Sequence, residues 1–194
     1  MLAEDRAAGA DAVLGFIREQ LRLRFLTADR VALVRALELA DDEDALAAVD
    51  RAFHAASPIE PHRTASLRNG AALLAAHVRL GTAGAVSYQR RIRVQRAFGH
   101  LPVVQGLVFG GLGLGEGEAV RVAGYGLVMG MAQAALRLGR IGAIDAQRVI
   151  ADALADLEAI ADEPVGDAAP ASFTPLSDIA AIGHARHRGR LFAS

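Results

Sequence analysis

Apolar residues recur at three- and four-residue steps along most of this chain, and short polar or glycine-rich breaks separate the repeats. Residues 3–25 show the pattern most clearly, because their large apolar side chains fall on one face of a helix. These side chains are Val13, Leu14, Ile17, Leu21 and Phe25. The alternation of apolar and polar residues that marks a half-buried strand is poorly represented. The pattern therefore predicts a protein built of helices.

Capping residues divide the first half of the chain. Thr27 can cap the helix that follows it, where Val31 begins a new apolar repeat. The acidic run at residues 41–44 suits the N-terminus of another helix through the helix dipole. Pro61 suits the first turn of a helix that reaches about Leu80.

Glycines divide the second half. Gly81 and Gly99 are expected to lie on either side of a helix over about 83–98. Further helices are expected over about 101–114, 117–138 and 145–162, the last capped by Asp145, with a short final helix from about Ser177. The prediction is a single all-α domain, a bundle of about eight to ten helices. Its core is expected over about 3–163, followed by a loop and a C-terminal tail over about 164–194.

Composition narrows the possible chemistry. The chain has 194 residues, 53% of them hydrophobic, and a formal net charge of −1. It has no cysteine, which excludes disulfides and thiolate metal sites. Every one of the 21 basic residues is arginine, which excludes a Schiff-base lysine and the lysine of a phosphate-binding P-loop. No signal peptide is visible, and the uncharged runs 97–115 and 122–136 are interpreted as buried helices rather than membrane spans.

Two glycine patterns suggest sites that the neighbouring residues do not support. Gly111, Gly113 and Gly115 resemble part of a phosphate loop, but Glu116 interrupts the spacing and would repel a phosphate. Gly126 and Gly130 are spaced four residues apart in an apolar helix, which predicts a close helix crossing within the chain or across a dimer.

Polar residues form no convergent catalytic or metal-binding set. His184 and His187 would share one side of a helix, but no further ligand lies near them and neighbouring arginines would oppose a cation. The other histidines are dispersed in sequence and are interpreted as structural or surface groups. Glu118 and Arg121 have the spacing of an ordinary helical ion pair. No enzyme activity, cofactor or metal site is therefore predicted.

Charge is unevenly distributed along the chain. Residues 61–96 contain seven arginines and no acid, whereas residues 145–167 contain seven acids and one arginine. Within the first region, residues 89–96 form the densest basic stretch. Nucleic-acid binding is weakly supported because the whole chain is slightly acidic and has few aromatic residues. The remaining interpretations are an acidic protein partner or a solvated helix face.

The C-terminal tail combines arginines with large apolar side chains. Arg186, Arg188 and Arg190 alternate with other residues, and Leu191 and Phe192 follow almost at the carboxyl end. Exposed apolar surface is unfavourable in water, so we expect this segment to be covered. It either docks on a partner protein or folds back over its own core.

Four stretches and the tail resemble the UreF family of urease accessory proteins. The tail is similar to the family's Asp-Ile, His and closing Arg-Leu-Phe-x-Ser pattern. An Arg-x-x-Ser-x-x-x-Gly helix, a Gly-His-x-Pro-Val-Val segment and an Arg-Leu-Gly, Gly, Gln sequence also match in order. The matching residues are Arg63, Ser66 and Gly70; Gly99, His100, Pro102, Val103, Val104 and Gly106; and Arg137, Gly139, Gly142 and Gln147. The resemblance covers nearly the whole chain.

The chain departs from the family pattern in three places. Members usually open with a Pro-x-Gly-Gly-Phe-x-His-Ser-x-Gly-Leu-Glu-like segment, and this chain begins after that point. Pro61 stands where the family has a glutamate before the Arg63 position, and Ala185 replaces the acid that commonly follows the tail histidine. These changes weaken the transfer of single residue roles.

The resemblance implies a non-catalytic, dimeric, all-α adaptor in the cytoplasm. Such proteins join UreD, also called UreH, and recruit the GTPase UreG, so that nickel reaches the urease apoenzyme. Neither nucleic acid nor a membrane is an implied partner. The residues that the resemblance assigns to partner binding are Asp178, His184, Arg186, Arg188, Arg190, Leu191, Phe192 and Ser194. The alternatives are a helical ligand-binding transcriptional regulator and an uncharacterised α-helical enzyme.

Overall fold

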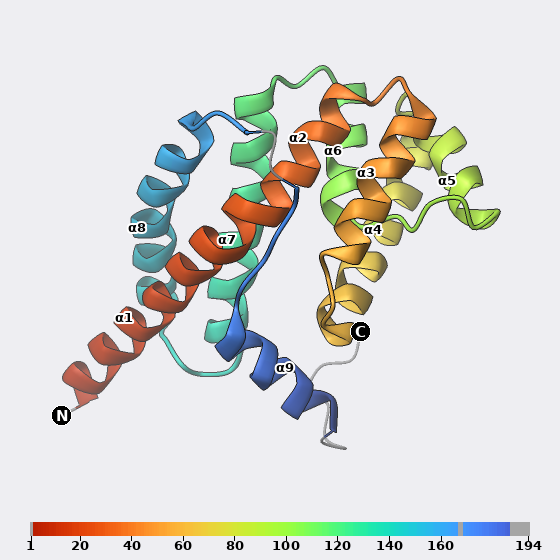
Figure 1. The fold of residues 1–194 in the computed structure, drawn as a ribbon. Coiled ribbons are helices and arrows are strands. Elements are labelled where there is room, and N and C mark those ends of the chain that lie inside the picture. Colours follow the sequence, from red (N-terminus) through yellow and green to blue (C-terminus); the bar gives the residue numbers. More distant parts are fainter. Residues whose placement is uncertain (1, 167–168, 187–194) are drawn as a thin grey trace.

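The computed structural model describes the backbone of residues 2–166 and 169–186 and the side chains of residues 9–166 and 169–183. All regular structure in these residues is helical, which confirms the all-α prediction (Figure 1). The elements are α1 (Leu2–Gln20), η1 (Leu21–Asp29), α2 (Arg30–Glu38), α3 (Glu43–Ala55), α4 (Glu60–Leu80), α5 (Ala85–Arg93), α6 (Leu101–Gly111), α7 (Glu116–Arg137), α8 (Ala143–Asp162) and α9 (Pro175–Arg186).

The first three elements form one continuous helical rod. η1 is a π-helical segment whose two flanking residues, Gln20 and Arg30, keep right-handed helical angles. The predicted cap at Thr27 is therefore wrong. Its hydroxyl instead donates to the carbonyl oxygen of Leu23, 3.1 Å away, within the same segment. Such wide π-turns are rare and occur often at functional sites.

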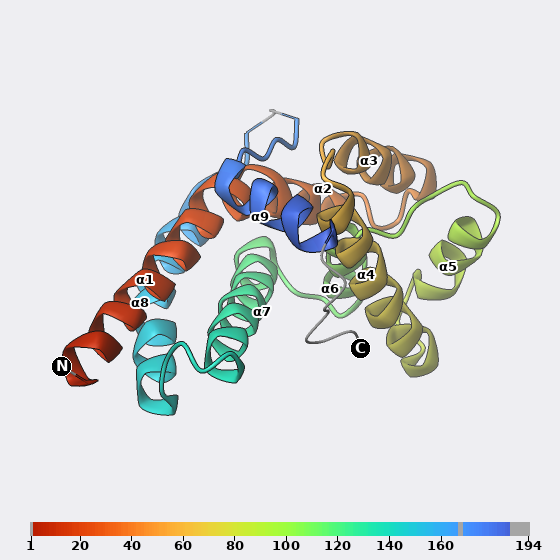
Figure 2. The ribbon, with the colours of Figure 1, turned by 90° about the horizontal axis from the view of Figure 1, so that it is seen from below.

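The two largest apolar cores share this rod. The first core packs α1, η1 and α2 against α7 and α8, around Ile17, Leu21, Val128 and Leu157. The second packs α2 against α3, α4, α5 and α6, and contains Ala32 among its buried residues. In Figures 1 and 2, α8 and α7 accordingly lie beside the early part of the rod, and α3 to α6 lie beside its end.

Close backbone approach explains the small residues of α6. Gly106 faces α2, where an added Cβ would lie 2.3 Å from the carbonyl oxygen of Leu33. Only glycine fits at this distance, so α2 and α6 can pack with their backbones nearly in contact. This crossing is the most extensive helix pair in the described structure.

Several predicted boundaries are confirmed. The Asp42 side chain caps α3 by accepting the N–H groups of Asp44 and Ala45 at 3.0 Å each. Pro61 lies in the first turn of α4. Gly81 ends the same helix in the left-handed conformation, with φ of 73°.

Other boundary and pairing predictions are wrong. α5 begins at Ala85 and ends at Arg93, well inside the predicted range of 83–98, because the residues after it turn back toward α3. Gly142, not Asp145, caps α8. Arg121 pairs with Glu158 and Asp162 of α8 at 2.7 Å each, while Glu118 accepts the N–H of Gly115.

α7 is the helix in the described residues whose length and apolar composition would allow it to cross a bilayer, with a mean hydropathy of 1.2 in its most apolar window. Buried core helices also meet this criterion, and 39% of that window is buried inside the structure. Its buried residues pack on α8 and on the rod.

Candidate partner-docking site

The segment before α9 is fastened to the π-helical part of the rod. The N–H of Ala171 donates to the carbonyl oxygen of Thr27 at 3.0 Å, and the N–H of Phe173 donates to that of Leu23 at 3.2 Å. η1 thus offers two of its backbone carbonyls to a chain segment more than 140 positions later in the sequence. These bonds fix the point at which α9 leaves the body of the protein.

The start of the same segment is held by a buried arginine. The Arg30 guanidinium donates to the carbonyl oxygens of Ile160, of Glu163 at 2.9 Å and of Pro164 at 3.2 Å. These carbonyls belong to the end of α8 and the residues that follow it, where a helix leaves acceptors unsatisfied and a cation is favoured. Arg30 therefore caps α8 and directs the chain toward α9.

One side of α9 is polar and faces the protein. The Ser177 hydroxyl accepts a hydrogen bond from Nε2 of Gln20 in α1 at 2.8 Å. The buried Thr174 hydroxyl donates to Oδ1 of Asp178 at 3.0 Å. Nε2 of His62 in α4 lies 3.4 Å from the same oxygen, a contact without hydrogen-bond geometry. α9 is therefore attached to both α1 and α4.

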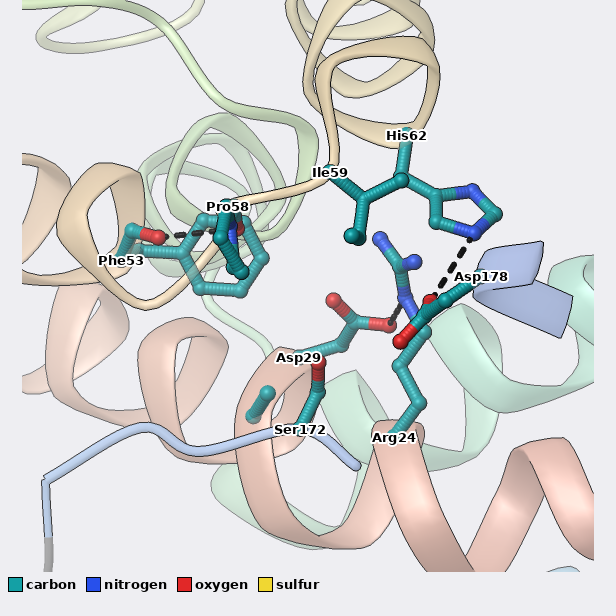
Figure 3. A pocket seen from close by; sticks show the side chains of 10 residues that line it. Arg24, Asp29, Phe53, Pro58, Ile59, His62, Ser172 and Asp178 are labelled. Carbon is teal, nitrogen blue, oxygen red and sulfur yellow. Dashed lines mark hydrogen bonds and ion pairs between the residues drawn. The ribbon is translucent and has the colours of Figure 1, made fainter. Parts of the chain in front are cut away.

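A small polar cavity lies beneath these contacts (Figure 3). Its volume is about 10 Å³, close to the space that one water molecule needs. Nε of Arg24 pairs with Oδ2 of Asp29 at 3.3 Å on its floor, and His62 and Asp178 meet beside them. The cavity is lined by Arg24, Ala28, Asp29, Phe53, Ser57, Pro58, Ile59, His62, Ser172 and Asp178.

Burial shifts the pKa values of two ionisable side chains that line this cavity, Asp29 and His62. Loss of solvent raises the pKa of Asp29, and the Arg24 guanidinium opposes that rise. Burial also lowers the pKa of His62; Arg24 adds to this effect and Asp178 opposes it. His62 is therefore neutral at pH 7, so its contact with Asp178 is not a full ion pair.

The opposite side of α9 is apolar and exposed. Leu176 and Ile179, which lie opposite Ser177 and Asp178 around the helix, are 72% and 69% exposed, and Phe173 in the segment just before α9 is 74% exposed. Ile182 is 39% exposed, but it follows Asp178 by one turn and lies nearer the polar side. Large apolar side chains in a contiguous exposed row typically mark an interaction site. We name these three residues, 173, 176 and 179, the α9 apolar face.

The structure describes only part of the predicted partner-binding set. Asp178 lies on the polar side of α9, against Thr174 and His62. His184 and Arg186 lie in the last turns of α9, and their side chains are outside the described residues. Residues 187–194 also lie outside them, and with these Arg188, Arg190, Leu191, Phe192 and Ser194. Docking of the tail therefore stays a prediction.

The first group of predicted family-motif residues converges where α4 crosses α6. A Cβ added at Gly70 would lie 2.1 Å from the carbonyl oxygen of Gly99. The Ser66 hydroxyl oxygen accepts the N–H of Leu101 at 3.2 Å and lies 3.1 Å from Nδ1 of His100. Pro102 occupies the first turn of α6. One Arg63 nitrogen lies 3.4 Å from the carbonyl oxygen of Ser57, and Gly106 faces α2.

The second group surrounds the turn from α7 to α8. Gly139 adopts a left-handed φ of 66°, which glycine allows without strain, and Gly142 is the N-cap of α8. Arg137 lies exposed in the last turn of α7. Gln147 is exposed on α8, and no contact in the structure explains why this position would need glutamine.

Sequence reasoning missed the centre of the α3–α6 region, the fully buried Asp50. Its carboxylate accepts the Tyr88 hydroxyl at 2.8 Å and the backbone N–H groups of Phe98, Gly99 and His100 at 2.6, 2.7 and 3.2 Å. The sequence pattern does indicate that Asp50 is buried, because this residue lies on the apolar face of α3, four residues after Leu46.

Two of the histidines that are dispersed in sequence come together in the fold. Nδ1 of His54 lies 3.0 Å from Nε2 of His100, and the His54 ring stacks on Phe98 with centroids 3.7 Å apart. Burial lowers the pKa of His100 to about 4, and the proximity of His54 contributes to the shift while Asp50 opposes it. The pair is therefore uncharged at neutral pH.

An apolar groove is lined by residues of α7, α1 and α4. Figure 2 shows α7 lying between the other two helices. The volume of the groove is about 610 Å³, and Gly126 and Gly130 form part of its wall. A Cβ added at either glycine would meet no atom within 4 Å, so the close crossing predicted within the chain is wrong. Val122 and Tyr125 on the same helix are 48% and 46% exposed. α7 thus leaves one side uncovered.

In the described part of the chain, no cluster of three or more histidine, aspartate or glutamate side chains could hold a metal ion.

Comparison with known proteins identifies the family. The profile of the UreF family matches residues 7–154. The urease accessory protein UreF of Yersinia enterocolitica serotype O:8 is 29% identical over 167 residues, which cover 84% of this chain and 73% of the relative. That of Yersinia pestis strain Pestoides F is 28% identical over 159 residues, 80% of this chain and 70% of the relative. The helical fold and the order of the sequence motifs agree with the match to the family profile. The chain therefore belongs to the UreF family of urease accessory proteins.

Proposed function

We propose that this protein is a non-catalytic adaptor of urease maturation that joins UreD to the GTPase UreG in the cytoplasm, so that nickel is delivered to the urease apoenzyme. The observation that carries the proposal is the two-sided character of α9. Its polar side is fixed to α1 and α4, while the α9 apolar face at residues 173, 176 and 179 is exposed. A helix held in this way presents a preformed docking surface.

The size of the exposed side chains suits a stable contact. Burying one large apolar side chain is worth about 1.5–3 kcal/mol. Phe173, Leu176 and Ile179 together therefore provide several kcal/mol when a partner covers them, part of which offsets the entropy lost on association. Because α9 is already fixed, little of that gain is lost in ordering the helix itself.

The tail extends this surface in the proposal. His184 and Arg186 follow the apolar face along α9, and Leu191 and Phe192 act as further apolar anchors, with Arg188, Arg190 and Ser194 in polar contacts around them. Asp178 has a different role from the others, since it holds α9 in place through Thr174 and His62. UreD is the partner assigned to this surface.

Substitutions on α9 test the proposal directly. In cells that co-express UreD, the double variant Leu176→Ser/Ile179→Ser should capture about tenfold less UreD than the unmodified chain. Ile144→Ser is the matched control, because Ile144 is 71% exposed and lies in the first turn of a different helix, α8. Deletion of residues 186–194 should also abolish capture while the helical circular dichroism signal remains. Undiminished capture by both α9 and tail variants would refute the docking assignment.

The uncovered side of α7 is the proposed contact between two copies of the chain. Gly126 and Gly130 allow close approach of a second helix, and Val122 and Tyr125 supply apolar area beside them. The variant Gly126→Leu/Gly130→Leu has room in the monomer but would block that approach. Its sedimentation should shift from dimer to monomer at micromolar concentration, whereas Gly15→Leu, an equally open position on α1, should stay dimeric.

Absence of turnover is the second test of the adaptor role. The purified chain should hydrolyse neither urea nor GTP, because the described residues contain no convergent catalytic set. Robust hydrolysis of either compound would exclude the proposal in its present form.

A further inference from the structure

The side of the protein formed by α3 and α5 carries a basic hollow that the proposed function does not use. Its volume is about 390 Å³. The hollow is lined by Asp44, Arg51, Arg91, Gln95, Arg96, Ala97 and Phe98. Figures 1 and 2 both place α5 at the edge of the protein farthest from α1 and α8. The hollow is therefore separate from the α7 groove.

Two of its three arginines have no partner among the described residues. Arg51 and Arg96 are exposed, and neither side chain makes a hydrogen bond or ion pair with any residue that the structure describes. Arg91 binds the carboxylates of Glu43, at 3.0 Å, and of Asp44. Unpaired guanidinium groups around a concave surface create a positive potential that attracts anions.

The wall of the hollow is held in one conformation. Gln95, two residues after the end of α5, has a left-handed φ of 58°, and Phe98 and Gly99 then bond to Asp50 of α3. The N–H of Phe98 is fixed by the Asp50 carboxylate at 2.6 Å, and its ring is stacked on His54. The loop that carries Arg96 is thus anchored two residues later, at Phe98, which reduces the entropy lost when a ligand binds.

Carboxylates are the anions that this geometry favours. A guanidinium group presents a planar fork of donors that matches a carboxylate, and Arg91 already shows this recognition with an acidic segment of its own chain. Glu43 and Asp44 beside the hollow are paired with Arg91, so they oppose a short carboxylate ligand less than free acids would. A nucleic acid is longer and would also extend to Asp41 and Asp42, at a cost in repulsion.

We propose that the hollow binds a short acidic segment of a partner protein, whose aspartate or glutamate carboxylates pair with Arg51 and Arg96. Arg91 stays with Glu43 and Asp44 and keeps the wall in place. The exposed side of Phe98, which is 41% exposed, offers an apolar contact beside these charges.

A labelled hexaglutamate peptide is the probe, and its binding to the full chain is measured by fluorescence anisotropy at low salt. The variant Arg51→Gln/Arg96→Gln should weaken binding about tenfold, the effect of losing two partly exposed ion pairs. Arg79→Gln/Arg140→Gln is the control, since it removes the same charge from exposed positions on α4 and in the α7–α8 turn. The control should bind within about twofold of the unmodified chain.

Three results would overturn the proposal: equal loss in both variants, no peptide binding at all, or tighter binding of pyrophosphate or of a single-stranded DNA hexamer than of the peptide. The last result would assign the hollow to phosphate groups instead. Capture of UreD provides the link to the proposed function, because it should be unaffected by Arg51→Gln/Arg96→Gln. This site and the α9 surface can therefore fail independently.

Discussion

The carboxylate of Asp50 accepts the hydroxyl of Tyr88 at 2.8 Å, in an environment where both residues are almost fully buried. Burial raises the pKa of Tyr88, and the Asp50 charge raises it further, so the phenol keeps its proton and remains a donor. With three backbone N–H groups on the same carboxylate, the charge of Asp50 is solvated by protein donors instead of water.

Asp50→Asn should destabilise the protein by about 3 kcal/mol, since the amide removes one acceptor oxygen and sets an N–H group against backbone donors. Tyr88→Phe should cost about 1 kcal/mol, because the other three donors remain on the carboxylate. Urea unfolding followed by circular dichroism measures both. Asp152→Asn, at an exposed position on α8, is the control and should stay within about 0.5 kcal/mol. Equal effects for Asp50→Asn and this control would contradict the role given to Asp50.

Stability should fall as the pH is lowered from 7 toward 4. His100 has a pKa of about 4 in the folded protein, mainly through burial, against an ordinary value of 6.5. The unfolded chain therefore binds more protons than the folded one between these values, and stability rises with pH across that window. The pKa of His54 is lowered too, so it acts in the same direction.

Urea midpoints at several pH values between 4 and 7.5 check this dependence. His100→Gln should have a flatter profile than the unmodified chain at the acid end, although its stability at pH 7 is lower. If His100→Gln leaves the dependence of the urea midpoint on pH unchanged, groups other than His100 cause the loss of stability in acid.

Gly70→Ala should destabilise the crossing of α4 and α6 by about 3 kcal/mol, because the new methyl group would overlap the carbonyl of Gly99 and the backbone has little room to move. Gly15→Ala is the matched test of helix propensity, since no atom lies within 4 Å of that position. It should instead stabilise the protein by about 0.5–1 kcal/mol. Thermal unfolding of both variants measures the two effects. A similar destabilisation of Gly70→Ala and Gly15→Ala would show that contact with the Gly99 carbonyl is not the cause.

Arg30→Met should loosen the path from α8 to α9. The carbonyl oxygens of Ile160, Glu163 and Pro164 would lose their common donor, at a cost of about 2 kcal/mol. Hydrogen exchange resolved by mass spectrometry should show faster exchange in peptides covering residues 160–178. Peptides from α6 should be unaffected, and uniform acceleration throughout the chain would indicate a general loss of stability.

The sequence predicted the helices well because their signals are local. The Asp42 cap, Pro61 in a first turn and Gly81 at a helix end each act within a few residues of their own position. The π-helical segment escaped prediction for the same reason. Leu21 and Phe25 are four residues apart whether the turn between them is of the α or the π type, so the apolar pattern does not distinguish the two.

The candidate site was less predictable because its contacts join distant parts of the chain. Asp50 lies on the apolar face of α3, which indicates burial, yet its partners come from a loop almost 50 residues later. Leu176 and Ile179 have helical spacing, but spacing alone does not say whether the face they form is covered by the protein or exposed. Glu118 and Arg121 were paired on spacing, whereas Arg121 reaches across to α8.

The wide turns of η1 also set the rotational phase between the two ends of the rod. Side chains of α1 reach the layer of α7 and α8, while Ala32 and Ala36 of α2 face the layer of α6. Removing one residue from Leu21–Asp29 would rotate one end against the other by about 100°. One of the two layers would then lose its apolar partner, and the carbonyls that hold the C-terminal segment would turn away from it. The number of residues in this π-helical segment is therefore fixed by packing at both ends of the rod.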